Sequence, residues 1–278
     1  EGGDLPPLEA PPDGELVVKI DYADPDALAR PEAYVTFTFT AREATAWCEA
    51  GHEVAWEQFR ANDLRLPSPA ERTAGAPAAS STAITVTDEP ELAIALDSTP
   101  LVERGPSLNL FRATTDNDGI RGWAGQEEKP MGQWLAAGLD ALRRVERQVE
   151  RPADGGADAS EPLLVERTKY VGSDEKAVIA CEQTIRRAGP ALLRFDVAVD
   201  VPASLPSLPR IGVILETVPR FEQLSWFGRG PWENHIDRKE GYPVGRYAGT
   251  VAEQYVPYIM PQENGSKCEV RWFELSNG

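Results

Sequence analysis

Hydrophobic and polar residues alternate with a period of two over several short segments of this chain. Within Tyr34–Thr40, the residues Val35, Phe37 and Phe39 share one face, and the other face is formed mostly by threonine. A period of two with aromatic and β-branched residues is typical of a half-buried strand. Segments 193–201 and 211–217 alternate in the same way, and less regular candidates occupy 163–171, 177–187 and 268–275. Many short strands of this kind favour an all-β sandwich over alternating strand–helix units.

One segment has the period of a helix instead. Its apolar residues recur at spacings of three and four, at Met131, Trp134, Leu135, Leu139 and Leu142. Pro130 stands where the first turn of a helix tolerates proline, because the N–H of that position has no partner within the helix. The pattern therefore predicts one short helix over residues 130–142 that covers one end of the sandwich.

Two stretches rich in proline and small residues interrupt the strand pattern. Residues 67–81 contain Pro, Ala and Ser without periodicity, which is typical of a connector between domains. Residues 152–162 are similar in composition, but strands flank them closely, so we predict a long hairpin loop there. The sequence thus predicts a small β domain over 1–75 and a larger one over 76–278, and no internal repeat stands out.

Composition and charge narrow the class of partner. The 278 residues are 41% hydrophobic and carry a formal net charge of −17. This excess of carboxylates argues against nucleic acid as a partner, since binding to phosphates requires Lys and Arg, and against docking on anionic lipid. The sequence contains no run of about 18 apolar residues, so we expect no membrane span.

The cysteines indicate the cellular compartment of the protein, and the chain ends indicate how it relates to a longer polypeptide. Cys48, Cys181 and Cys268 lie far apart and form no CxxC pair, which fits a reducing cytosol better than a disulfide framework. We therefore expect a cytoplasmic protein. The chain begins at Glu1 without Met and stops at Gly278 where a strand runs into a turn, so we expect both ends to be cuts through a larger architecture.

The first of three polar clusters lies at residues 112–119. Asp116, Asn117 and Asp118 follow one another directly, whereas an EF-hand calcium loop alternates its ligands and ends with a Glu. Consecutive Asp and Asn residues before a Gly also form ordinary turns. We therefore predict no metal site in this cluster.

The second and third clusters, 228–238 and 255–265, each contain a Glu-Asn pair. Glu233 and Glu263 have the chemistry of the two carboxylates that a glycosidase places on either side of the scissile bond. Glu-Asn pairs that follow a proline in turns more often bond the backbone of neighbouring loops, and we favour that interpretation. The candidates for sugar contacts or for a loop network are Arg112, Asp116, Asn117, Asp118, Glu233, Asn234 and Arg238.

Taken together, the clusters resemble the C-terminal region of the large β-galactosidases of glycoside hydrolase family 2. Residues 109–119 resemble the family's Trp or Phe followed by Arg-Ala-Pro/Thr-Thr-Asp-Asn-Asp. Residues 226–238 are similar to its Gly-x-Gly-Pro-x-Glu-Asn-Tyr-x-Asp-Arg, with His235 at the usual Tyr position. Residues 255–265 match Tyr-x-x-Pro-Tyr-x-x-Pro-x-Glu-Asn-Gly, and 44–59 look like the family's immunoglobulin-like domain.

The resemblance implies a fold and a set of partners. The fold would be the end of an immunoglobulin-like β-sandwich, followed by part of a galactose-mutarotase-like supersandwich, the small-chain domain, incomplete at its C-terminus. The two catalytic glutamates would lie in a TIM barrel upstream, and a Trp of the galactose pocket would lie beyond Gly278. We thus expect no catalytic residue, cofactor or metal in this segment. Magnesium and sodium, a galactoside substrate, the catalytic barrel and further copies in a homo-oligomer would belong to the full enzyme.

The function implied is that of a non-catalytic portion of an enzyme that hydrolyses terminal non-reducing β-D-galactose, as in lactose-type substrates. This portion would support the barrel and the sugar pocket. A carbohydrate-binding module of mutarotase-like fold without hydrolysis and a purely structural interaction domain remain open as alternatives. Between Val86 and Pro106 the chain is shorter than the family's opening hairpin. We therefore expect the start of the large sandwich to be altered, with an exposed edge.

Overall fold

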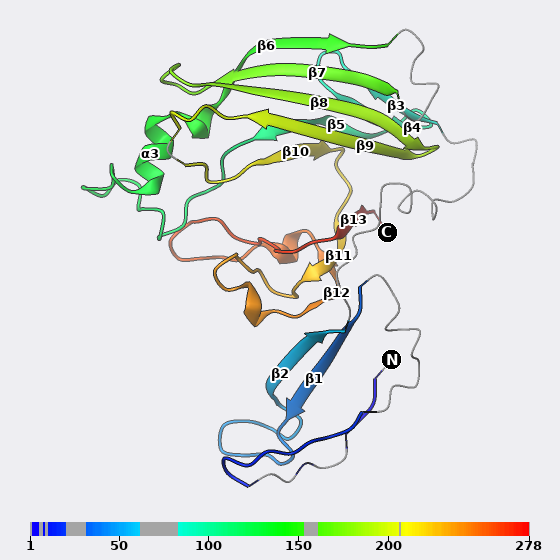
Figure 1. The fold of residues 1–278 in the computed structure, drawn as a ribbon, viewed down its shortest axis with the longest axis vertical. Helices are drawn as coiled ribbons and strands as arrows, with labels where there is room; N and C mark the ends of the chain where they lie inside the picture. Colours follow the sequence, from blue (N-terminus) through cyan, green and yellow to red (C-terminus); the bar gives the residue numbers. More distant parts are fainter. Residues whose placement is uncertain are drawn as a thin grey trace. The chain divides into compact units, whose positions relative to one another are not determined.

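The computed structural model describes residues 2–5, 8, 11–20, 32–61, 83–152, 161–205 and 207–277 (Figure 1). The chain divides into two compact units, Glu1–Ser68 and Pro69–Gly278. The predicted connector at 67–81 lies outside the described residues. No helix in the described ranges is long and apolar enough to cross a membrane.

In the described part of the first unit, the regular structure is an antiparallel hairpin. It pairs β1 (Tyr34–Thr40) with β2 (Glu53–Arg60), so the strand predicted from the alternation at Tyr34–Thr40 is confirmed. Phe37 of β1 and Phe59 of β2 meet edge to face, with ring centroids 6.0 Å apart. A diagonal cross-strand contact between aromatic rings stabilises such a pair.

Three antiparallel sheets build the described part of the second unit (Figure 1). The β5 sheet, in the order β10-β5-β4-β3, contains β3 (Ile84–Thr87), β4 (Ala93–Leu96), β5 (Thr99–Asn109) and β10 (Gly212–Thr217). The β8 sheet, in the order β6-β7-β8-β9, contains β6 (Arg143–Glu150), β7 (Pro162–Val171), β8 (Val178–Gly189) and β9 (Leu192–Asp200). The β11 sheet, in the order β12-β11-β13, contains β11 (Gln223–Arg229), β12 (Val244–Thr250) and β13 (Trp272–Ser276).

Four of the predicted strands of this unit are confirmed as β7, β8, β9 and β10. The strand predicted over 268–275 is wrong at its start, because β13 begins only at Trp272. Glu269, three residues before β13, has a positive φ of 51°, a conformation that a regular strand does not contain. β6 and β7, which flank the predicted hairpin loop at 152–162, pair antiparallel, but residues 153–160 of that loop lie outside the described residues.

The core of the second unit lies between the β5 and β8 sheets. One buried cluster contains Leu110, Trp134, Leu139 and Ile179, which come from the end of β5, the helical region and β8. A second buried cluster contains Leu92, Leu164 and Ile185. Figure 1 shows the β8 sheet layered over β5 and β10, with the helix at one end. The predicted all-β sandwich with one short helix is therefore confirmed.

The helix itself is shorter than predicted. α3 spans Pro130–Ala136, and a separate 3-10 turn, η1, spans Leu139–Ala141. Gly138 between them has a φ of +68°, and a Cβ at this position would lie 2.1 Å from the backbone nitrogen of Ser173. The chain must reverse here against the backbone of the β7–β8 turn, so a continuous helix cannot form.

The stretch between Val86 and Pro106, where we expected an altered start of the large sandwich, forms two successive hairpins. β3 pairs with β4 and β4 pairs with β5. β3 has four residues and stands at the edge of the β5 sheet. A short edge strand presents few backbone groups that could pair with another chain.

The outer face of the β8 sheet is covered by cross-strand ion pairs. Arg167 of β7 pairs with Glu150 of β6 at 3.1 Å and with Glu182 of β8 at 2.7 Å. Lys169 pairs with Glu146 at 2.7 Å. These side chains are all about half exposed or more open, so each pair contributes little stability on its own. Their alternation with the buried residues of the same strands defines which side of the sheet faces the core.

Candidate functional site

The loop that follows β5 is organised around the carboxylate of Asp118. The guanidinium of Arg112 donates to both carboxylate oxygens, from Nη1 at 2.6 Å and from Nη2 at 3.1 Å. The backbone N–H and the hydroxyl of Thr115 donate to Oδ2 at 2.8 and 3.0 Å. The guanidinium also lies over the indole of Trp134, 5.4 Å from the ring centroid. A bidentate ion pair stacked on an aromatic ring fixes this loop as a rigid unit.

The four predicted residues of this loop fall into two groups. Burial alone would raise the pKa of Asp118, but the hydrogen bonds from Arg112 and Thr115 outweigh burial and hold that pKa below its usual value. Asp118 and Arg112 are thus committed to the loop. Asp116 and Asn117 are exposed at the turn, where Asp116 Oδ1 accepts the backbone N–H of Asn117 at 3.1 Å.

A second carboxylate, Glu233, joins two loops of the β11 sheet. Its side chain is 6% exposed. Oε1 accepts hydrogen bonds from Arg238 Nη2 at 2.5 Å and from the hydroxyl of Tyr258, and Oε2 accepts the backbone N–H of Gly265 at 2.8 Å. Burial favours the neutral acid, yet the donors Tyr258, Gly265 and Arg238 together lower the pKa of Glu233. The group is an ionised anchor whose oxygens are already occupied.

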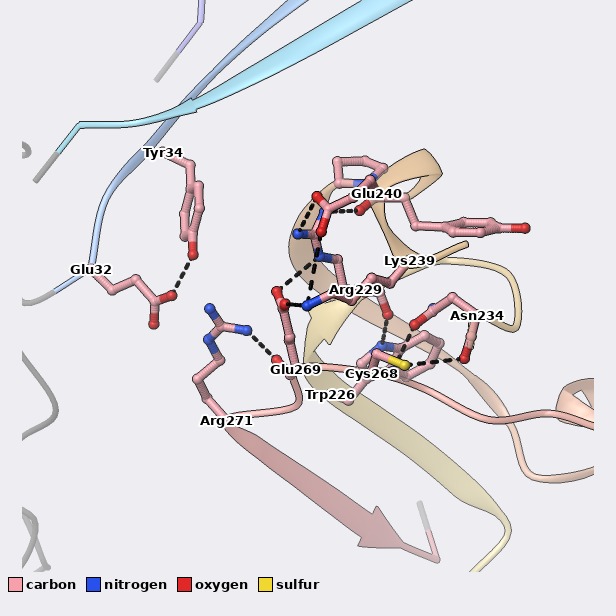
Figure 2. A network of polar contacts seen from close by, with 12 residues as sticks. Glu32, Tyr34, Trp226, Arg229, Asn234, Lys239, Glu240, Cys268, Glu269 and Arg271 are labelled. Carbon is pink, nitrogen blue, oxygen red and sulfur yellow. Dashed lines mark hydrogen bonds and ion pairs between the residues drawn. The ribbon is translucent and has the colours of Figure 1, made fainter. Parts of the chain in front are cut away.

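Asn234, the next residue, is fully buried. Its Nδ2 donates to the carbonyl oxygen of Trp232 at 3.0 Å, and its Oδ1 accepts the backbone N–H of Cys268 at 2.7 Å. Its own backbone N–H donates to the carbonyl of Ser266 at 2.8 Å. Figure 2 shows the Asn234 side chain directed at the segment of Cys268. Asn234 therefore holds the two loops together and presents no atom to a ligand at the surface.

Glu263 connects the third cluster to the first. Its Oε2 accepts the backbone N–H of Ala113 at 3.0 Å, and its Oε1 accepts Arg210 Nη2 at 2.6 Å. Its backbone N–H donates to the carbonyl of Thr114 at 3.4 Å. Because the same loop also supplies Gly265 to Glu233, all three sequence clusters belong to one hydrogen-bonded network.

The two Glu-Asn pairs are used in the same way. Asn264 donates to the carbonyl of Gln262, two residues earlier, at 3.1 Å, and accepts the backbone N–H of Val256 at 3.1 Å. Asn234 likewise donates to the carbonyl of Trp232, two residues earlier. Each glutamate accepts one arginine and one backbone N–H from a distant segment. The repeated Pro-x-Glu-Asn sequence is thus a loop clamp that occurs twice in the second unit.

A further set of ion pairs fixes the base of the second loop. The side chain of Arg229, which is 13% exposed, donates from Nε to Glu269 at 2.9 Å, from Nη2 to Glu240 at 2.9 Å and from Nη1 to the carbonyl of Tyr242 at 2.9 Å. Lys239 forms a second ion pair with Glu269 (Figure 2). These contacts lower the pKa of Glu269, with the hydrogen bond from Lys239 as the largest cause. Three of the donor positions of Arg229 are used to fix the loop.

The arrangement supports scaffolding better than proton transfer. A glycosidase acid must hold a proton and its nucleophile must be free to attack, but Glu233 and Glu263 each accept an arginine and a backbone N–H. No group of three or more His, Cys, Asp or Glu side chains among the described residues could hold a metal ion. The network can position loops, and it has no carboxylate pair poised for hydrolysis.

An open cavity of about 470 Å³ borders the network. Its lining includes apolar residues such as Leu108 and Leu110, and polar groups of Arg112, Arg210 and Glu263. Of the seven predicted candidates, only Arg112 lines this cavity. The others lie in the turn at Asp116 or in the loops around Glu233, so the candidates do not converge on one pocket.

Sequence reasoning missed several members of the network. Arg210 and Arg229 stood outside the predicted set, and Tyr258 and Glu263 were not predicted as partners of the other clusters. The repeated Pro-x-Glu-Asn sequence was the available signal, because two occurrences of one short motif in a domain indicate a shared structural task.

The pKa of Glu233 leads to a prediction for acid stability. A carboxylate with a lowered folded-state pKa stabilises the fold above its usual value of 4.5, and that contribution is lost as the pH falls through the folded-state value. Glu233→Gln should therefore unfold at lower urea than the wild type at pH 7, and the difference should shrink as the pH falls below 4.5. Urea titrations at several pH values measure this. Glu103→Gln, at an exposed position, is the control, and a difference for Glu233→Gln that is independent of pH would contradict the prediction.

Comparison with known proteins gives the same family for both units. A family model described as "Beta galactosidase small chain" matches residues 91–278, and one described as "Beta-galactosidase, domain 4" matches residues 1–62. The first match covers more than half of the chain and contains the whole network described above.

Curated relatives carry the same name. A β-galactosidase of Arthrobacter sp. (strain B7) is 34% identical over 270 residues, which is 90% of this chain and 25% of the relative. Those of Vibrio cholerae and Priestia megaterium are 30% and 27% identical, each over 97% of this chain and about a quarter of their own length. The chain spans roughly a quarter of these relatives. With its family matches, the chain belongs to the β-galactosidase family, in its small-chain and domain 4 regions.

Proposed function

We propose that this chain is the non-catalytic C-terminal portion of a β-galactosidase, and that the catalytic carboxylates lie in polypeptide outside these 278 residues. The observation that carries the proposal is that Glu233 and Glu263 each accept an arginine and a backbone N–H from the surrounding loops. A retaining glycosidase needs one carboxylate that attacks and another that donates a proton. Neither glutamate is available for these tasks.

The whole enzyme would hydrolyse terminal non-reducing β-D-galactose, as in lactose-type substrates, by double displacement at two glutamates of a TIM barrel. The relatives named β-galactosidase support this substrate class. Magnesium and sodium would bind the full enzyme outside this segment. The enzyme would be a cytoplasmic homo-oligomer, and the free thiols of Cys48, Cys181 and Cys268 fit a reducing compartment.

The contribution of this chain to the enzyme would be rigidity. The Asp118 loop and the two Glu-Asn clamps hold their loops through buried, charge-assisted hydrogen bonds. Exposed polar residues on those loops, such as Asp116 and Asn117, would then form part of the wall of the sugar pocket. Walls that are fixed before the substrate binds require little reorganisation during the reaction.

The isolated chain is therefore expected to be inactive. Purified residues 1–278 should not release the chromophore from a chromogenic β-galactoside, whereas the full-length protein should. The matched control is the full-length protein with Glu233→Gln, which alters a clamp and leaves the barrel glutamates in place, and should keep measurable turnover. Hydrolysis by the isolated chain that disappears in Glu233→Gln would show that the catalytic groups are here after all.

A further inference from the structure

The second Glu-Asn clamp contains a chemically labile pair of residues. Asn264 is followed directly by Gly265. In an Asn-Gly pair, the backbone nitrogen of the glycine can attack the side-chain carbonyl carbon of the asparagine, because glycine has no Cβ to obstruct the approach. The asparagine then loses its amide nitrogen, and such thermolabile residues limit the chemical lifetime of proteins.

The loop nevertheless requires both residues of the pair. The side chain of Asn264 accepts the backbone N–H of Val256 and donates to the carbonyl of Gln262, each at 3.1 Å. Gly265 has a φ of +74°, and a Cβ at this position would lie 2.6 Å from the carbonyl oxygen of Gln254. A residue with a side chain would therefore be strained at position 265. The fold itself imposes the labile pair.

The nitrogen that would attack is occupied by Glu233. The backbone N–H of Gly265 donates to Oε2 of Glu233 at 2.8 Å. The attack requires removal of this proton, and a carboxylate at hydrogen-bonding distance disfavours negative charge on the nitrogen. Glu233 is itself 6% exposed and accepts hydrogen bonds from Arg238 and Tyr258, so the acceptor is fixed in place.

The group that would be attacked is held as well. Both ends of the Asn264 side-chain amide are bonded to the loop backbone, so the amide cannot rotate toward the Gly265 nitrogen without breaking those bonds. We propose that Asn264 is a deamidation site whose reaction is suppressed in the folded protein by the hydrogen bond from Gly265 to Glu233. This inference concerns chemical ageing and is independent of the proposed function.

The reaction would proceed when the loop opens. Hydroxide removes the amide proton of Gly265, the nitrogen forms a bond to Cγ of Asn264, and the bond between Cγ and Nδ2 breaks. Water protonates the departing nitrogen, which leaves as ammonia. A second water molecule then opens the cyclic imide at either carbonyl carbon, which gives aspartate or isoaspartate at position 264. Solvent supplies every co-reactant, and no oxidation or reduction occurs.

Either product would prevent the clamp from closing again. An ionised aspartate has no donor for the carbonyl of Gln262, and it adds a negative charge directly beside Glu263. Isoaspartate also lengthens the main chain by one carbon, which displaces the Gly265 N–H from Glu233. Each opening that ends in deamidation therefore disables the clamp permanently, and the loop is a point at which unfolding becomes irreversible.

A comparison that needs no variant tests the proposal first. The full-length protein and a synthetic peptide of residues 255–270 are incubated at mildly alkaline pH, and mass spectrometry of the peptides that contain position 264 quantifies asparagine, aspartate and isoaspartate. Deamidation in the folded protein should be at least about tenfold slower than in the peptide, because local opening must precede the attack. Equal rates would overturn the proposal.

Two variants of the full-length protein then identify the protecting bond. Glu233→Ala removes the acceptor of the Gly265 N–H, so deamidation at Asn264 should rise toward the rate in the peptide. Tyr258→Phe is the matched control, because it removes another hydrogen bond to the same carboxylate and leaves the Gly265 bond in place. Its deamidation rate should stay close to that of the wild type. Wild-type rates in both variants, or an equal rise in both, would contradict protection by the Gly265 bond.

Hydrogen exchange at the Gly265 amide supplies an independent readout in the same proteins. Exchange should be slow in the wild type and in Tyr258→Phe, and fast in Glu233→Ala, because only the last lacks the acceptor. Faster deamidation of Glu233→Ala without faster exchange at Gly265 would overturn the proposal. If Glu233→Ala does not fold, the comparison of the wild type with the peptide still decides whether the folded loop protects Asn264.

Discussion

Leu110→Ala is expected to lower the free energy of unfolding of the second unit by about 3–4 kcal/mol. Leu110 is fully buried and packs with Trp134, Leu139 and Ile179, so it touches the helical region and the β8 sheet at once. Alanine would remove three carbons, one methine and two methyl groups, and leave a cavity, since the surrounding strands are fixed by their hydrogen bonds and cannot collapse into the space. Chemical denaturation of the chain with a tryptophan signal measures the loss.

The matched control for this prediction is Leu215→Ala. Leu215 is 42% exposed on β10, so the same truncation there removes little buried surface and should cost less than about 1 kcal/mol. If both variants lost the same stability, the buried cluster around Leu110 would not be the centre of the sandwich. A loss confined to Leu110→Ala supports the packing of the two sheets described above.

Asn234→Ala is expected to cost about 2–3 kcal/mol, although it removes no apolar contact of note. The side chain serves the N–H of Cys268 and the carbonyl of Trp232, and it is fully buried. Alanine would leave both backbone groups without a partner in a place that water does not reach, and that penalty exceeds the net value of an ordinary hydrogen bond. The loss should appear in the urea midpoint with an unchanged m-value.

Asn117→Ala provides the comparison. Asn117 is exposed in the turn beside Asp118, and its replacement should change the free energy of unfolding by no more than about 0.5 kcal/mol. An equally small effect for Asn234→Ala would mean that the clamp at Asn234 contributes nothing to stability. The two asparagines belong to similar polar clusters in the sequence, so the contrast isolates the effect of burial.

The strands that the sequence predicted are those in which a single buried face imposes a clean alternation. β9 is the best example, because Leu193 and Phe195 pack on one core cluster and Val199 packs on the other. In β7 and β8, buried residues alternate with more exposed ones in the structure, although their sequence patterns are less regular, whereas β10 was predicted from its pattern and is mostly exposed. Strands β3 and β4 have four residues each, which is too short for alternation to be distinguished from chance.

Tertiary contacts account for the elements that were predicted incorrectly. The helix pattern continues to Leu142, yet α3 stops at Ala136 because the backbone at Gly138 packs against Ser173, a residue far along the chain. The start of β13 shifts because Cys268 is bonded to Asn234 and Glu269 to Arg229. Periodicity within one segment contains no information about such partners.

In the candidate site, too, the sequence predicted the local features, and tertiary contacts decided the rest. The three clusters were found as clusters because dense polar residues between strands are visible in any single sequence. That the Glu-Asn pairs bond the backbone of neighbouring loops was predicted, but the segments that they join were not, since Glu263 and Ala113 are 150 residues apart. Burial was equally hidden, and it separates Asn234, which is enclosed, from Asn117, which is exposed. Residue type identified the polar chemistry, and the fold decided which groups remain accessible.

The ion-paired face of the β8 sheet has a practical consequence. A macromolecule that bound over Arg167, Lys169 and their carboxylate partners would have to desolvate charged side chains of both signs. The new contacts would offset little of that desolvation free energy. We therefore expect this face to remain exposed to solvent. It is the place to attach a dye, a biotin or a tether to a sensor surface, because a label there would leave the buried interior and the remaining loops undisturbed.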